Sequence, residues 1–277
     1  MSNRKKELEY FDSTIDVGRR LRSHIQRVSR KVKPTKPALH LSYFFFSKAL
    51  KSLGATRLLW ASGFFPDALV ISRCIFETCV LDAYIRRDRG RLTDKYLAYD
   101  AVARHNLSVG MVRSMKDRRG KAWLQWKAAA ARYGRAVKNL PYEFGDARGW
   151  SGKSLRDIVR VLEKDGIQGI WSAYEFFYGL GSAVAHSSSQ SMQEYMRQPY
   201  RTSYKRYGQR RAYLRDVPML TCRWCLIAGL LSAHDHFRLD EEFAPGDALV
   251  DAYHLLRSLI HALGEDLKEF DSKFFLF

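Results

Sequence analysis

Residues 171–190 read WSAYEFFYGLGSAVAHSSSQ, and this stretch decides the fold that we expect. It begins as an apolar helix and ends in small and polar residues. Polar side chains recur on it at every fourth position: Tyr174, Tyr178, Ser182 and His186. On an α-helix this spacing places them on one slowly drifting face. A polar stripe on an apolar helix must find partners or line a cavity, so the stretch predicts a packed helix that carries a candidate site.

The rest of the chain has helical periodicity and no convincing period-two alternation, which predicts an all-α helical bundle. Helices are expected over residues 6–32, 38–53, 66–88, 93–116, 121–138, 154–163, 167–185, 216–237 and 247–270. Ser154 and Asp157 have the spacing of a capping box at the start of one of them. We expect a basic N-terminal helix, residues 1–37, followed by a single helical domain, residues 38–277, with a basic insertion.

The 277 residues carry a formal net charge of +18, and the pI is near 9.9. This charge favours polyanionic partners, with nucleic acid first and an anionic membrane surface second. The N-terminal sequence MSNRKKELEYFD lacks the apolar core of a signal peptide. The longest apolar run, residues 217–233, is short for a membrane span and contains Arg223. We therefore expect a cytoplasmic protein without a membrane span.

Two central segments concentrate positive charge. Residues 113–138 hold nine Lys/Arg and one acid, and residues 197–215 hold seven Lys/Arg and no acid, with tyrosines interleaved. Tyrosine rings can stack on unpaired bases while the cations neutralise phosphates, so we assign nucleic-acid binding to the second segment. Its expected contacts are Arg201, Tyr204, Lys205, Arg206, Tyr207, Arg210 and Arg211. The alternatives are a solvated loop or a contact with the acidic region 240–277.

Arg73 and Glu77 are four residues apart on one apolar helix, which predicts an ion pair, because either charge left alone would be costly. The pair is either a structural element or part of a catalytic site. His186 has the same two interpretations: an imidazole suits acid–base work near neutral pH, and it also packs as a structural residue.

The four cysteines are Cys74, Cys79, Cys222 and Cys225, and all lie in helical patterns. We expect free thiols, with the C-x-x-C pair at 222–225 part of the core rather than a metal or redox site. There is no Walker loop and no G-x-G-x-x-G or G-x-S-x-G motif. We therefore expect no cofactor and no metal. The apolar tail 274–277 is expected to dock on the body or on a second copy in a homodimer.

Three patterns carry a family resemblance: the helix ALVISRCIFETCVLDAYI at 68–85, the loop WSGKSLRD at 150–157, and the tyrosine-to-histidine helix with its serine run. Together they resemble a bacterial domain family of unknown function whose members have an R-x3-E helix and a W-x-G-K-S loop. The resemblance covers residues 60–190 and implies no specific activity.

The architecture is also similar to the HEPN superfamily, helical bundles that often dimerise and often act as RNases in toxin and phage-defence systems. Their signature places an Arg four to six residues before a His on one helix. Residues 180–182, before His186, contain no Arg, so this resemblance would require Arg73 to supply the guanidinium from another helix.

Two functions follow. The first is an RNA-directed effector, in which Arg73, Glu77, Tyr178 and His186 cleave a phosphodiester without metal. The second is a non-catalytic binding or adaptor protein of a bacterial defence complex, in which Arg73, Glu77 and His186 only hold the bundle together. Substituting His186→Ala separates them, since the first predicts a folded, inactive protein.

Overall fold

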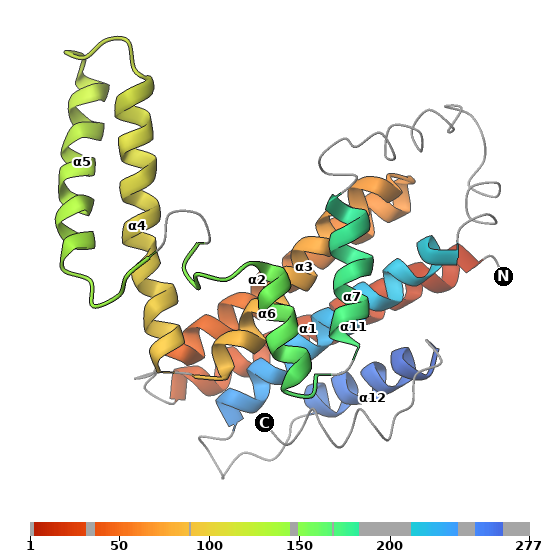
Figure 1. Cartoon of the computed structure of the whole chain (residues 1–277). Coiled ribbons are helices and arrows are strands. Elements are labelled where there is room, and N and C mark those ends of the chain that lie inside the picture. Colours follow the sequence, from red (N-terminus) through yellow and green to blue (C-terminus); the bar gives the residue numbers. More distant parts are fainter. Residues whose placement is uncertain are drawn as a thin grey trace. The chain divides into compact units, whose positions relative to one another are not determined.

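The computed structural model describes residues 3–31, 37–88, 90–144, 149–167, 169–182, 212–237 and 247–262. Every regular element in these ranges is helical and none is a strand, so the all-α prediction is confirmed there (Figure 1). The elements are α1 (Asn3–Lys31), α2 (Pro37–Ser62), α3 (Phe65–Arg86), α4 (Arg91–Ser114), α5 (Lys121–Lys138), α6 (Leu155–Lys164), α7 (Ile170–Tyr174), η1 (Glu175–Leu180), α11 (Ala212–Phe237) and α12 (Asp247–Ala262).

The chain divides into two compact units. Unit 1 comprises Met1–Tyr84 and Ile158–Phe277, and unit 2 comprises Ile85–Asp157. Whether the residues beyond 37 fold as one domain stays a prediction. Among the described helices, none is both long enough and apolar enough to span a bilayer.

Helix α11 lies at the centre of unit 1, where it contacts α1, α2 and α12. Its residues 221–230 are all buried, and Gly229 lets two neighbours approach closely. A Cβ at Gly229 would lie 2.7 Å from the Phe46 ring and 3.1 Å from Leu21. The apolar side of α1 packs into this core, since Phe11, Leu21 and Ile25 are completely buried.

Helix α2 is longer than predicted, because it continues past Gly54 to Ser62. Glycine disfavours a helix interior, but Thr56 and Trp60 are buried on the following turns, and this burial outweighs the propensity. The helix ends at Gly63, whose φ is +86°. The Gly63 amide donates to Trp60 O and the Phe64 amide to Leu59 O, which is the Schellman pattern.

Helices α4 and α5 form an antiparallel hairpin within unit 2 (Figure 1). They approach closely at Gly134, where an added Cβ would lie 3.1 Å from the His105 ring, and His105 Nδ1 is 3.1 Å from Ala130 O. No residue of α5 is buried, so this helix exposes at least part of every side chain.

The capping box predicted before α6 is confirmed. Ser154 Oγ donates to Asp157 Oδ2 at 2.6 Å, and the Asp157 amide donates to Ser154 Oγ at 3.2 Å. The Asp157 carboxylate also accepts from the Ser154 amide. These bonds satisfy donors that would otherwise have no intrahelical partner.

Candidate functional site

Tyr174 and Tyr178 of the predicted polar stripe lie on α7 and η1 of unit 1. The prediction of an uninterrupted α-helix over 167–185 is wrong, because residues Glu175–Leu180 form a π-helix. A π-helical turn widens the backbone to i→i+5 bonding, and such turns are frequent at functional sites. Tyr174 and Tyr178 nevertheless share a face, with their rings stacked at 5.0 Å and an interplanar angle of 14°.

Arg73 and Glu77 form the predicted ion pair on α3, with 2.7 Å between Arg73 Nε and Glu77 Oε1. The side chains are 17% and 31% exposed, so water screens the pair only in part. The pair packs against η1: Arg73 Cζ lies 4.2 Å from the centroid of the Tyr178 ring. A Cβ on Gly181 would lie 3.1 Å from Arg73 Cβ, so the glycine permits this close approach.

Several polar atoms of this cluster have no hydrogen-bond partner in the described part of the chain. The hydrogen bond described for Arg73 runs from Nε to Glu77 Oε1, and none is described for its terminal nitrogens. The hydroxyl of Ser182 is buried, and it too has no described partner. A guanidinium that is fixed by its Nε and by an aromatic face keeps its terminal edge available for an anion.

The cluster rests on an aromatic core that fixes its position. Phe177, next to Tyr178, is completely buried and stacks on Phe76 of α3 at 5.6 Å. Phe76 in turn meets Trp224 of α11 edge to face at 5.2 Å. The Cys79 thiol donates to the Trp224 carbonyl at 3.1 Å. Helices α3 and α11 therefore hold η1 in place through side chains that are almost entirely buried.

The C-x-x-C pair is part of this core, as expected. Cys222 and Cys225 are buried free thiols, and burial raises the pKa of Cys222 to about 12. Burial also raises the pKa of Cys225, with a further increase from Cys222. No three His, Cys, Asp or Glu side chains of the described ranges are grouped as metal ligands.

The predicted site is only partly described. Arg73, Glu77 and Tyr178 come together, whereas His186 lies outside the described residues. The assigned nucleic-acid segment is also outside them: residues 201–211 are not described, and no side chain of 212–215 is. The same holds for the tail 274–277 and its expected docking.

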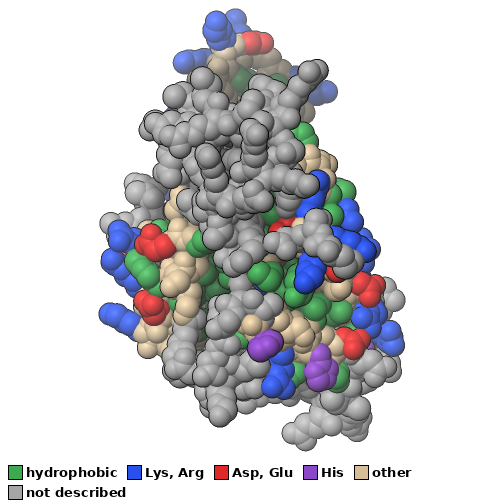
Figure 2. Space-filling view, turned by 90° about the vertical axis from the view of Figure 1, so that its right-hand side faces the viewer, with side chains coloured by type: hydrophobic (Ala, Val, Ile, Leu, Met, Phe, Trp, Pro, Cys, Tyr) green, Lys and Arg blue, Asp and Glu red, His purple; other side chains and the backbone are tan. Residues whose placement is uncertain are grey.

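A second candidate surface lies on the α4–α5 hairpin, to which the sequence patterns assigned no function. All nine Lys/Arg of the segment 113–138 are exposed, together with its single acid, Asp117. They are Arg113, Lys116, Arg118, Arg119, Lys121, Lys127, Arg132, Arg135 and Lys138. Lys and Arg side chains gather over the turn between α4 and α5, at the top of Figure 2. We call these nine side chains the basic hairpin surface.

Charge is unevenly divided between the two units. The sequence of unit 2 contains eighteen Lys/Arg and seven Asp/Glu, so this quarter of the chain contributes +11 of the +18 net charge. The excess of cations in this part of the chain was visible in the sequence. Only the structure shows that the cations of α5 share a helix that buries none of its residues.

Comparison with known proteins gives one family. A family model matches residues 39–202, and its description is a family of unknown function (DUF5677). The matched range contains Arg73, Glu77, Tyr178 and His186 as well as the whole α4–α5 hairpin. No curated protein and no solved structure matches the chain, so the HEPN-like core stays a prediction.

Proposed function

Because the chain belongs to the DUF5677 family, whose function is unknown, we propose a function from its own side chains: it binds nucleic acid, and RNA first, through the basic hairpin surface. One observation carries this proposal: nine exposed cations and a single acid within 26 consecutive residues. Uncompensated like charges repel one another, and a polyanion relieves that repulsion and releases its own counterions.

RNA is the first class to consider because aromatic rings accompany the cations. Lys127 Nζ lies 4.7 Å from the centroid of the Trp123 ring, and Arg132 Cζ lies 4.6 Å from that of Tyr133. Recognition of RNA commonly targets unpaired bases, which stack on aromatic side chains and guanidinium planes. Cation–aromatic pairs on an exposed helix supply both kinds of contact.

The test compares two triple variants with equal charge change. The hairpin triple is K121Q/R135Q/K138Q, and the control triple R19Q/R27Q/K51Q removes three exposed cations of unit 1. Affinity for single-stranded RNA and DNA is measured by fluorescence anisotropy across salt. Each phosphate that is no longer neutralised lowers the slope of log K against log salt by about 0.7, so the slope of the hairpin triple should fall by about 2. Equal decreases in both triples would show that the hairpin is not the site.

RNA cleavage is a second candidate, and the available edge of Arg73 favours it. The terminal nitrogens of Arg73 meet no described acceptor and could hold a phosphate, with Glu77, Tyr178 and His186 as the acid–base groups. A HEPN-like core would agree with such an RNase in a defence system. H186A should then fold and bind RNA but not cleave it. If wild type and H186A leave RNA equally intact, the alternative of a non-catalytic adaptor applies.

A further inference from the structure

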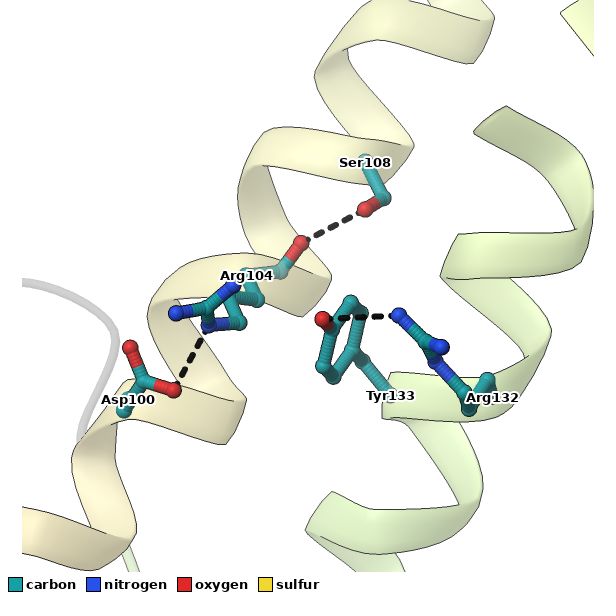
Figure 3. Close-up of polar contacts among 5 residues, drawn as sticks. All are labelled: Asp100, Arg104, Ser108, Arg132 and Tyr133. Atoms are coloured by element: carbon teal, nitrogen blue, oxygen red, sulfur yellow. Dashed lines mark hydrogen bonds and ion pairs between the residues drawn. The ribbon is translucent and has the colours of Figure 1, made fainter. Parts of the chain in front are cut away.

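Two arginines from different helices converge on one tyrosine in the α4–α5 hairpin. Figure 3 shows the Tyr133 ring between Arg104 of α4 and Arg132 of α5. Arg132 Nη2 donates to Tyr133 Oη at 2.8 Å, and its Cζ lies 4.6 Å from the ring centroid. Arg104 Cζ lies 5.8 Å from the same centroid. Both guanidinium groups are therefore held near a single hydroxyl.

The position of Arg104 is fixed independently of Tyr133. Its Nε donates to Asp100 Oδ2 at 2.6 Å, one turn earlier on α4, and its backbone carbonyl accepts from Ser108 (Figure 3). The Arg104 guanidinium is also the first cause of a lowered pKa of Tyr133, with Arg132 adding to it. Arg104 and Arg132 thus both act on the phenol oxygen.

Positive charge exceeds negative charge among these four side chains. Arg104 pairs with one carboxylate, Asp100, and the group between the two arginines is the Tyr133 hydroxyl. The Arg104 side chain is 55% exposed, so burial does not explain why the cations lie together. The two positive guanidinium groups repel each other. A strong anionic acceptor bound between them would attract both and so replace this repulsion with a net attraction.

We infer that Arg104, Arg132 and Tyr133 form a binding site for one phosphodiester of an RNA backbone. Guanidinium forks match phosphate oxygens with paired N–H donors, and a phosphate oxygen is a stronger acceptor than a phenol. When the arginines turn to the phosphate, the Tyr133 hydroxyl can donate its proton to the same group. The inference rests on the proposed function and names the point on the hairpin where a phosphate is held by geometry as well as charge.

Variants that conserve charge distinguish phosphate binding at these three residues from binding that depends only on the net positive charge of the hairpin. R104K and R132K keep the charge but lose the fork, and Y133F removes only the hydroxyl. Each should weaken binding of fluorescein-labelled single-stranded RNA by about tenfold or more, the effect of losing one charge-assisted hydrogen bond. The matched control is R19K on α1, because Arg19 is exposed and lies outside the basic hairpin surface. It should bind as wild type does.

Each outcome decides the inference. Thermal unfolding by circular dichroism checks that the variants fold, and R104K stands in for Y133F should the latter unfold. If the hairpin triple loses affinity while R104K, R132K and Y133F bind as wild type does, the phosphate site is refuted and the proposed function stands. If wild type binds no RNA, both fail. Poly-glutamate is tested as a competitor of the labelled RNA. If it competes as effectively as unlabelled RNA at equal charge, and if R132K weakens poly-glutamate binding as much as RNA binding, the ligand is an acidic protein and the inference is overturned.

Discussion

The guanidinium carbon of Arg73 lies 4.2 Å from the centroid of the Tyr178 ring, and these residues are 105 positions apart in the sequence. The contact joins α3 to the π-helical segment η1. Tyr178 also stacks on Tyr174, so its ring has a cation and a second ring as neighbours. Whatever else Arg73 does, it therefore stabilises the packing of these two elements.

Substituting Arg73→Ala should lower the free energy of unfolding by about 1–3 kcal/mol, because it removes a partly buried cation–π contact and an ion pair. Tyr178→Phe keeps the ring, so its stability should remain within about 0.5 kcal/mol of wild type. Urea denaturation measures both variants. An R73A protein as stable as wild type would mean that this contact does not hold α3 to η1.

Gly229→Ala should destabilise the protein, since its Cβ would meet the buried Phe46 ring, which has little room to move. Overpacking of this kind costs about 1–3 kcal/mol, against which better helix propensity returns about 1 kcal/mol. The matched control is Gly110→Ala on α4, where no atom lies within 4 Å of the new Cβ. That variant should be more stable than wild type, and the two melting temperatures should shift in opposite directions.

Native thiol labelling should modify Cys74 quickly and the other three cysteines only after unfolding. Cys74 is exposed, whereas Cys79, Cys222 and Cys225 are buried. Although Cys74 is exposed, partial loss of water around its sulfur, and then Glu77, raise the pKa of Cys74, so its labelling rate should increase with pH beyond the range of an ordinary thiol. Ellman's reagent follows the reaction, and C74S should abolish the fast phase. A fast phase that persists in C74S would contradict the described core.

The stability of the protein should fall as pH drops below about 6.5, in part because of His24. Burial first, and the Arg27 charge second, lower its pKa in the folded state. Below the pKa that His24 has in the unfolded chain, the unfolded chain binds the proton more readily than the folded one, so protonation favours unfolding. Above that pKa, His24 makes no contribution to the pH dependence of stability. Denaturation of wild type and H24Q between pH 5 and 8 should show a smaller pH dependence in H24Q. Parallel profiles would exclude His24 as a cause.

Helix propensity and residue spacing predicted the features that depend only on residues close together in the sequence. The bounds of α5 were predicted correctly, because an alanine-rich stretch with many helix formers follows Gly120. The Arg73–Glu77 pair followed from i, i+4 spacing. The extension of α2 beyond Gly54 was missed, because it depends on the burial of Thr56 and Trp60 by other parts of the chain.

Other features have no local signal at all. The π-helix at 175–180 shifts backbone bonding by one residue within a sequence that is also compatible with an α-helix. The approach of Arg104 to Tyr133 joins two helices across 29 positions, and only the hairpin geometry brings them together. The sequence shows which residues are cationic but not which of them lie around one hydroxyl.

A helix with no buried residue, such as α5, has a consequence for how this protein can evolve. Most surface substitutions change stability by no more than about 0.5 kcal/mol. Exchanges on the outer side of α5 therefore have almost no cost to folding, whereas the packed interior of α11 tolerates few changes. If the proposed function holds, the binding preference of unit 2 can drift between descendants of this chain while the core of unit 1 stays constant.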